Sequence, residues 1–198
     1  LKNVQMIACE DTRVTKRLLN FYKINNKMIS YNDYNEDKKS NDLIKLLHNN
    51  DNIALVSDAG TPTISDPGYR IVNKALIQGY KVFSIPGPCS AIAALSISGL
   101  PTDKFYFEGF LPKKKGRQTH FIFLKSLDST IIIYESPKRI LKTLKELIIF
   151  FGKDRKASVS RELTKIYQEN KRGTLEELFI SFETRIIKGE IVLIIDGK

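Results

Sequence analysis

Short apolar runs typical of β-strands alternate with helical patterns along the whole of this 198-residue sequence. Because helices that connect strands place those strands in parallel, the alternation predicts an α/β protein with largely parallel sheets. The predicted strands cover residues 4–9, 27–31, 52–57, 81–85, 105–108, 130–134, 157–161, 167–171 and 190–196. The predicted helices cover residues 12–20, 42–49, 69–78, 90–98, 118–125, 138–151 and 175–182.

One short segment, Gly99-Leu100-Pro101, is the best candidate for a hinge. Glycine and proline interrupt regular structure, and the strand and helix pattern restarts after this segment. A chain of this length also suits two small domains. We therefore predict two unlike α/β domains, residues 1–101 and residues 102–198.

The net charge of +10 is unevenly distributed along the chain. Residues 1–102 carry +3, whereas residues 103–198 carry +7. A solvated, lysine-rich surface is the ordinary explanation for a basic protein of this size. The uneven distribution favours the alternative, in which the second half is the docking surface for a polyanion such as RNA.

The sequence argues against a membrane protein, a secreted protein and a metal site. The apolar runs 147–151 and 191–195 are far shorter than the roughly 20 residues of a membrane-spanning helix. No secretion signal follows Leu1, so we expect a cytoplasmic protein whose natural start lies upstream. Cys9 and Cys89 are the only cysteines, and we expect free thiols and no metal.

Two turns rich in glycine and proline follow predicted strands in the first half. They are Asp58-Ala59-Gly60-Thr61-Pro62 and Pro86-Gly87-Pro88-Cys89-Ser90-Ala91. Loops at strand ends of α/β sheets bind ligands, small residues let a ligand approach the backbone, and Asp58 could accept hydrogen bonds from ribose hydroxyls. Either turn could also be an ordinary loop. Neither has the spacing of a triphosphate or dinucleotide motif.

A series of segments, in the same order, resembles the bacterial small-subunit rRNA methyltransferase I family. The segments are Cys9-Glu10-Asp11-Thr12-Arg13, Val56 to Pro62, Ile64 to Tyr69, Pro86 to Cys89, Gly99 to Pro101, Glu108 to Pro112, Tyr134-Glu135-Ser136, Arg161 to Lys165 and Lys188-Gly189-Glu190. The resemblance implies the tetrapyrrole methylase type of fold, a class III S-adenosylmethionine methyltransferase. Two α/β domains would then hold S-adenosylmethionine in a cleft between them, usually as a homodimer.

The resemblance also implies a reaction and a substrate. Members of this family 2′-O-methylate the ribose of a decoding-centre cytidine, cytidine 1402, in 16S ribosomal RNA. The substrate would be small-subunit ribosomal RNA or the assembled 30S subunit. Family members begin with a strand and a Pro-x-Gly-Asn-Leu loop that lines the cleft, and this sequence starts after them. We therefore expect one strand and part of the pocket to be missing from this chain.

The same resemblance assigns residues to the cofactor and to the chemistry. Residues expected against the cofactor are Asp58, Ala59, Gly60, Thr61, Pro86, Ser90, Ala91 and Tyr134. Candidates for accepting the ribose proton or orienting the ribose are Glu10, Asp11, Glu108, Glu162 and Lys165. A carboxylate can accept the proton directly, whereas lysine would need a lowered pKa. Each candidate could instead be a partner in a structural ion pair.

Basic and aromatic residues are the candidates for RNA contact. Arg13 could grip a phosphate or support its helix, and Lys113, Lys114, Lys115 and Arg117 could bind RNA or form a solvated loop. Lys138, Arg139 and Lys142 are the next candidates. Tyr22, Tyr31 and Tyr34 could stack on unpaired bases or be half-buried.

Two other functions remain open at this point. A methylase of the same fold could act on a small corrin precursor, because fold does not fix function. Alternatively, the chain could be an RNA-binding protein without catalytic activity.

Overall fold

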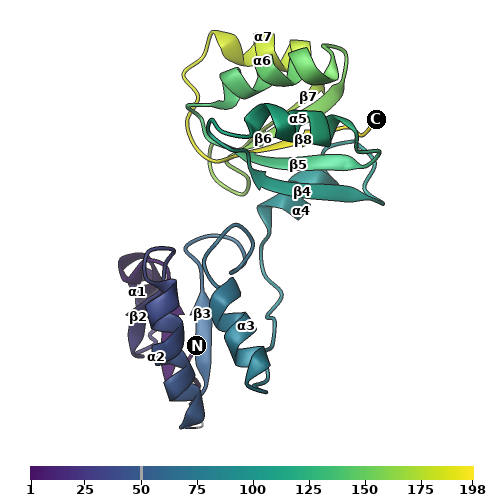
Figure 1. The fold of residues 1–198 in the computed structure, drawn as a ribbon. Coiled ribbons are helices and arrows are strands. Elements are labelled where there is room, and N and C mark those ends of the chain that lie inside the picture. The colour runs from purple at the N-terminus through teal and green to yellow at the C-terminus, as the bar shows by residue number, and fades with distance from the viewer. Residues whose placement is uncertain (50) are drawn as a thin grey trace. The chain divides into compact units, whose positions relative to one another are not determined.

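The computed structural model describes residues 1–49 and 51–198, and these form two compact units. The first unit covers Leu1–Pro88 and the second covers Cys89–Lys198 (Figure 1). Both combine helices with a β-sheet, as the alternating sequence pattern predicts.

The first unit contains a parallel three-stranded sheet in the order β2-β1-β3. Its strands are β1 (Met6–Cys9), β2 (Met28–Ser30) and β3 (Ile53–Val56), each shorter than the run predicted for it. Its helices are α1 (Thr12–Phe21), α2 (Glu36–His48) and α3 (Tyr69–Ile77). Each of the two crossovers from strand to strand contains one helix, which is why the strands are parallel.

Helices cover both faces of this sheet because side chains alternate along β1. Ala8 points to one face, where it packs with Leu43 of α2 and Ile71 of α3. Ile7 points to the opposite face, where it packs with Leu19 of α1. Helix α1 therefore lies on the opposite side of the sheet from α2 and α3.

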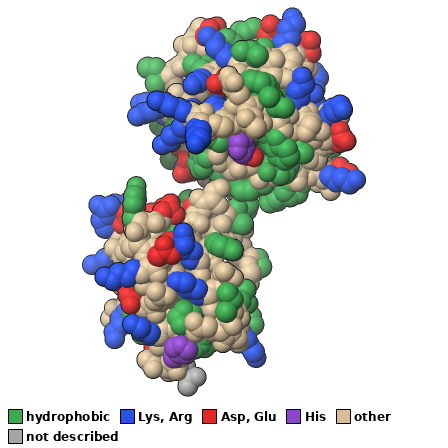
Figure 2. All heavy atoms as spheres, in the orientation of Figure 1, with side chains coloured by type: hydrophobic (Ala, Val, Ile, Leu, Met, Phe, Trp, Pro, Cys, Tyr) green, Lys and Arg blue, Asp and Glu red, His purple; other side chains and the backbone are tan. Residues whose placement is uncertain are grey.

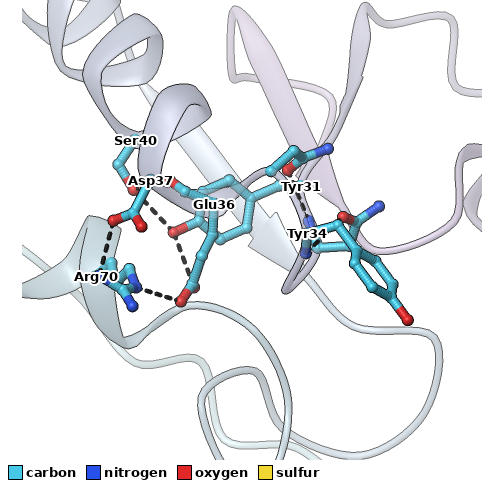
Figure 3. A network of polar contacts seen from close by, with 8 residues as sticks. Tyr31, Tyr34, Glu36, Asp37, Ser40 and Arg70 are labelled. Carbon is cyan, nitrogen blue, oxygen red and sulfur yellow. Dashed lines mark hydrogen bonds and ion pairs between the residues drawn. The ribbon is translucent and has the colours of Figure 1, made fainter.

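A polar network joins the first turn of α2 to the first turn of α3 (Figure 3). Arg70 donates to Glu36 at 2.6 Å and to Asp37 at 2.7 Å, and the buried hydroxyl of Tyr31 lies 2.9 Å from Ser40 Oγ. Two acidic residues suit the start of a helix, so α2 begins at Glu36, six residues earlier than predicted. Tyr31 is 1 % exposed, and this burial excludes it from stacking on RNA bases.

The predicted strand at residues 81–85 does not form. The segment has suitable residues, but in the described part of the chain it is paired with no strand of either sheet. Val82, Phe83 and Ile85 are therefore exposed. Strand propensity alone does not make a strand, because the backbone groups of a strand need a neighbouring strand to bond to.

The second unit contains a mixed five-stranded sheet in the order β4-β5-β8-β6-β7. Its strands are β4 (Phe105–Phe110), β5 (Thr130–Glu135), β6 (Lys156–Arg161), β7 (Glu169–Thr174) and β8 (Ile191–Ile195). Only β4 and β5 pair in parallel, and the other three pairings are antiparallel. The prediction of largely parallel sheets is therefore wrong for this unit, because the link between β6 and β7 is too short for a crossover helix.

Four helices cover the two faces of the second sheet. They are α4 (Ser90–Ser96), α5 (Arg117–Lys125), α6 (Ile140–Phe151) and α7 (Leu175–Glu183). The last three bury Phe121, Leu144 and Phe182 with Ile131 and Ile133 of β5. Helix α4 lies on the opposite face, which carries the alternate β5 residue, Ile132.

The division between the two units lies earlier in the chain than the hinge that the sequence predicts at Gly99-Leu100-Pro101. Helix α4 explains the difference, because Ala91, Ala94 and Leu95 pack against Ile132 and Val192 of the second sheet. The small-residue helix after Pro88 is thus part of the second unit.

Candidate functional site

The loops after β1 and β3 leave the same edge of the first sheet. The two strands are parallel, and Cys9 lies opposite Val56 in their register. Glu10 and Asp11 follow β1, while Ser57 and Asp58 follow β3. The loops also touch, because the Asp11 backbone N–H donates to Asp58 Oδ1 at 3.2 Å.

Asp11 begins helix α1 and is paired with Arg13. Its carboxylate accepts from the Arg13 backbone N–H at 2.8 Å and from the Arg13 guanidinium at 2.6 Å. These hydrogen bonds lower the pKa of Asp11 to about 2. A carboxylate with so low a pKa is a weak base, so we assign Asp11 to the support of the loop rather than to proton transfer.

The two turns rich in glycine and proline meet within the first unit. Thr61 Oγ1 donates to the carbonyl oxygen of Pro88 at 2.9 Å, and Ser57 Oγ donates to the carbonyl of Ala59 at 3.2 Å. Asp58, Ala59 and Gly60 are exposed beside this contact. The turn after β3 therefore presents a carboxylate and two small residues to solvent.

The rest of this loop has a strained backbone. Thr63 and Ser65 have φ angles of 75° and 59°, which residues with side chains rarely adopt. Gly68 has a φ of 146°, and a Cβ there would lie 2.7 Å from Thr63 Cγ2 and 2.8 Å from Leu55 Cδ2. Strain of this kind persists where surrounding contacts enforce it and is frequent at functional sites.

Asp66 lies in the same strained loop and is not among the candidate residues predicted from the sequence. Burial and the nearby charges of Glu10, Asp58 and Asp33 raise its pKa from 3.8 to about 6, although a hydrogen bond with Ser57 opposes the change. Asp66 stands within the family segment Ile64 to Tyr69, but nothing in the sequence indicates that its carboxyl group is partly buried.

Two further cofactor candidates meet in the second unit. Ser90 Oγ, at the first residue of α4, donates to the hydroxyl of Tyr134 on β5 at 2.9 Å. The Tyr134 ring makes edge contacts with Phe107 and Phe110 of β4, with centroids 5.1 and 5.6 Å away. Ala91 is buried against the sheet, so it supports α4 and is not an exposed contact.

The remaining candidates for proton transfer in the second unit lie close to other polar side chains, and two of them, Glu162 and Lys165, form an ion pair. Lys165 donates to Glu162 at 2.9 Å and to Glu190 at 3.0 Å, which raises the pKa of Lys165 and lowers that of Glu162. A lysine with a raised pKa cannot accept a proton at neutral pH. Glu108 lies 2.9 Å from His120 Nδ1.

Comparison with known proteins gives a family for this geometry. The sequence profile of the tetrapyrrole (corrin/porphyrin) methylases matches residues 1–178, which is most of the chain. The chain belongs to the tetrapyrrole methylase family. Family membership agrees with the two α/β units and makes the chain a methyltransferase.

Related sequences within this methylase family carry a common name. The chain is 47% identical over 199 residues to ribosomal RNA small subunit methyltransferase I of Halalkalibacterium halodurans. The matched region covers 100% of this chain and 68% of that protein. It is 41% identical over 198 residues to the protein of the same name from Thermotoga maritima, covering 100% of this chain and 89% of that one.

Solved structures support the methylase fold. A diphthine synthase matches with a TM-score of 0.73 at 15% identity, covering 100% of this chain and 81% of that one. A uroporphyrin-III C-methyl transferase from Thermus thermophilus, complexed with S-adenyl homocysteine, matches with a TM-score of 0.62 at 16% identity, covering 100% and 87%. At this level of identity the likeness concerns the fold alone.

The four basic residues predicted to contact RNA from the loop after β4 differ in their exposure to solvent. Lys113, Lys114 and Lys115 are exposed on the loop between β4 and α5. The first two line a shallow depression of about 300 Å³ together with Lys142 of α6. Figure 2 shows Lys and Arg side chains on the surfaces of both units.

Arg117, which the sequence analysis grouped with these lysines, lies in the interior. It is 5 % exposed and donates to Glu146 at 2.8 Å, to Thr143 at 2.7 Å and to the carbonyl of Pro112 at 3.0 Å. These contacts leave its guanidinium directed at protein rather than at solvent. We therefore treat Arg117 as the anchor of the lysine loop and leave it out of the RNA surface.

The part of the chain that the structure describes contains neither a membrane-spanning helix nor a cluster of side chains suited to a metal ion. None of the helices in residues 1–49 and 51–198 is both long and apolar enough to cross a membrane. Within the same residues, no group of three or more His, Cys, Asp or Glu side chains is arranged to hold a metal ion. Both cysteines are free thiols, with Cys9 buried.

Proposed function

We propose that this methylase transfers a methyl group from S-adenosylmethionine to the ribose 2′-hydroxyl of a decoding-centre cytidine in small-subunit ribosomal RNA. The observation that carries the proposal is the identity of 47% and 41% to two ribosomal RNA small subunit methyltransferases I over the whole of this chain. The exposed carboxylate turn at the end of β3 supports a nucleoside-binding role for the same chain.

The residues around Asp58 fit an adenosine cofactor. An exposed carboxylate can accept hydrogen bonds from ribose hydroxyls, and the hydrogen bond from the Asp11 N–H uses one of its several acceptor positions. Beside it, Ala59 and Gly60 allow a ligand to approach the backbone. A Cβ on Gly60 would meet only the carbonyl of Pro88, at 4.0 Å, so the turn has open space around it. We assign Pro86, Ser90 and Tyr134 to the same cofactor.

S-adenosylmethionine supplies an activated methyl group when it is bound, so the protein has to align the ribose and accept its proton. We assign the role of proton acceptor to the neighbouring carboxylates of Asp66 and Glu10. A general base works best when its pKa lies near the working pH. Asp66, with a pKa of about 6, therefore suits this role better than Asp11, with a pKa of about 2.

We assign RNA contact to the lysine loop, Lys113 to Lys115, with Lys142 of α6. Lys113, Lys114 and Lys142 line one depression, Lys115 is exposed beside them, and phosphate groups are attracted to clustered cations. We expect the substrate to be small-subunit ribosomal RNA or the assembled 30S subunit, in the cytoplasm, with the methylase acting as a homodimer.

The proposal is tested by two measurements on the full chain. Calorimetric titration should show S-adenosylmethionine binding with one molecule per chain. Transfer of labelled methyl groups should then occur to small-subunit ribosomal RNA or 30S subunits, and nuclease digestion should place the label on a cytidine ribose. A corrin precursor is the alternative acceptor in a parallel assay.

Each outcome separates the proposal from its two rivals. Label in the corrin precursor and none in RNA would show a small-molecule methylase. RNA binding without uptake of S-adenosylmethionine would show a binding protein without catalytic activity. Label on a base rather than on the ribose would retain the substrate and reject the 2′-hydroxyl.

A further inference from the structure

Helix α1 of the first unit has an exposed face that combines cations with apolar side chains. Thr15 and Leu19 are buried toward the sheet. Arg13, Arg17 and Phe21 follow one another at four-residue spacing on the opposite, exposed side. We call these three residues the α1 ridge.

The surroundings of the α1 ridge are apolar on one flank and basic on the other. Val14 and Leu18 are exposed beside it, and Tyr22 packs edge-on against Phe21 with ring centroids 5.0 Å apart. Phe21 is 79% exposed and Tyr22 is 58% exposed. Large aromatic rings this exposed at the end of a short helix add nothing to the core of this unit.

The charge of this segment is strongly one-sided. Residues 12–32 contain no acidic residue and five basic ones, which are Arg13, Lys16, Arg17, Lys23 and Lys27. These five charges exceed the net charge of +3 of residues 1–102, so the rest of that half is net acidic. The basic character of the first unit is thus concentrated on α1 and the turn after it.

The α1 ridge starts at the candidate site. Asp11 caps α1 and its backbone N–H bonds to Asp58, so the first turn of the helix adjoins the turn assigned to the cofactor. Phe21 lies ten residues farther along, which is about 15 Å at the rise of an α-helix. A strand of RNA leaving the site along α1 would reach Phe21 after a few nucleotides.

We propose that the α1 ridge binds the single-stranded RNA next to the methylated nucleotide, with Arg17 contacting a phosphate and Phe21 stacking on a base. The neighbouring Lys16 and Lys23 contact further phosphates. Cations interleaved with exposed aromatic rings are the combination that single-stranded nucleic acid requires. A second copy of the chain does not suit this face, because the two like-charged surfaces would repel each other. The proposal rests on the proposed function, since it names a further contact of the same RNA.

The test measures binding of a labelled single-stranded RNA oligonucleotide and of its duplex by fluorescence anisotropy. Phe21→Ala should weaken single-strand binding by roughly tenfold or more, as loss of a stacked base does. Phe21→Tyr should retain binding, whereas Phe21→Leu should not, because leucine offers apolar contact without a ring face. Duplex binding should change little.

Arg17→Ala tests the cations separately. It should weaken binding of the single strand and reduce its salt slope by about one unit, the contribution of one phosphate contact. The matched controls are Ile77→Ala on α3, which removes a side chain that is 76% exposed, and Lys45→Ala on α2, which removes an exposed cation. Both should bind RNA like the unaltered chain, and all variants should keep its melting temperature.

The outcomes distinguish this inference from the proposed function. Equal RNA binding by Phe21→Ala, Phe21→Leu and the unaltered chain would reject the α1 ridge and leave the proposed function intact, provided that the unaltered chain still methylates RNA. An unaltered chain that binds neither RNA nor S-adenosylmethionine would reject both. Equal loss with the Ile77→Ala control would also reject the ridge, because the effect would not be specific to α1.

Discussion

The carboxylate of Asp58 accepts a hydrogen bond from the backbone N–H of Asp11, at 3.2 Å, and so joins the loops that follow two parallel strands. The contact fixes the carboxylate at the edge of the sheet where α1 begins. It also means that Asp58 has two separable roles in our proposal. One is to hold the loop, and the other is to accept from a ribose hydroxyl of the cofactor.

Substitution at Asp58 can separate these roles. Asp58→Ala removes both, and we expect S-adenosylmethionine affinity to fall by roughly 1–3 kcal/mol, the usual cost of losing such a hydrogen bond. Asp58→Asn keeps a carbonyl oxygen for the Asp11 N–H but loses the charge. Calorimetry on both variants decides the issue, and unchanged affinity in a folded Asp58→Ala protein would remove Asp58 from the cofactor site.

Asp66 should make the stability of the fold depend on pH. Its pKa is raised in the folded state, from 3.8 to about 6, so the folded state favours the protonated carboxyl. The stabilising contribution is therefore fully present below pH 3.8 and is lost as the pH rises through about 6. Asp66→Asn, which mimics the protonated form, should raise the free energy of unfolding at pH 7.5 by roughly 1–3 kcal/mol.

Denaturant titrations between pH 4 and pH 8 would measure this difference for the variant and the unaltered chain. The gain from Asp66→Asn should shrink as the pH falls below about 6. An equal gain at every pH would show that the carboxyl does not titrate in this range. If Asp66 also accepts the ribose proton, the same variant should lose methyl transfer while it gains stability.

Gly68 and Gly79 form a matched pair for testing the strained loop. Both have positive φ angles, of 146° and 81°, but only Gly68 lacks room for a side chain. Nothing lies within 4 Å of a Cβ on Gly79, whereas a Cβ on Gly68 would overlap Thr63 and Leu55. Gly79→Ala should cost about 1–2 kcal/mol for the left-handed backbone alone.

Gly68→Ala should cost more than Gly79→Ala, by roughly a further 1–3 kcal/mol, because side chains must move to relieve the overlap. It should also weaken S-adenosylmethionine binding, since the loop from Ser57 to Gly68 carries Asp58. The checks are denaturant unfolding and calorimetry. Equal losses of stability in the two variants would show that the loop adapts and that its strain is not enforced by packing.

Arg117 should matter for folding more than for direct RNA contact. Its guanidinium is buried against Glu146, Thr143 and the Pro112 carbonyl, and Thr143 in turn donates to the buried Glu135 at 2.6 Å. Removing one partner of a buried charged network typically costs about 3–5 kcal/mol. Arg117→Ala should therefore lower the unfolding free energy by an amount near this range, measured by denaturant titration.

The control for Arg117 is its exposed neighbour Lys115. Lys115→Ala should change stability by less than about 0.5 kcal/mol, as surface substitutions usually do. Lys115→Ala should raise the free energy of RNA binding by more than it lowers the free energy of unfolding. A stable Arg117→Ala protein with much weaker RNA binding would overturn our assignment and return the arginine to the RNA surface.

Sequence patterns predicted most helices and strands because their signals are local. The apolar run at residues 130–134 could only be a buried strand, and Gly152 marks the end of α6 as expected. The antiparallel pairings of the second sheet were missed because they depend on where β8 inserts between β5 and β6. The strand at residues 81–85 was predicted but does not form, because a strand needs a neighbouring strand to pair with and the composition of a segment does not show whether it has one.

Site residues were predictable as positions in motifs but not as environments. The turn at Asp58 was identified from its residues and by resemblance, yet the Asp11 contact depends on strand register. Asp66 was overlooked because its pKa depends on burial and on carboxylates distant in sequence. Arg117 was grouped with its lysine neighbours because a basic run does not reveal which side chain faces inward.

The lysine loop carries three exposed cations, which follow the buried Leu111 and the anchoring carbonyl of Pro112. Replacing Lys113, Lys114 and Lys115 with Glu should weaken binding to small-subunit RNA and flatten its dependence on salt, because each phosphate contact contributes about one unit of slope. A control that replaces Lys38, Lys45 and Lys125 with Glu changes the net charge equally at other exposed positions. Titrations of RNA at several salt concentrations, and of S-adenosylmethionine at one, should show the flattened slope only for the first variant and equal cofactor affinity in both. If both variants lose RNA affinity to the same extent, net charge rather than this loop governs binding, and the depression beside Lys142 is not the docking surface.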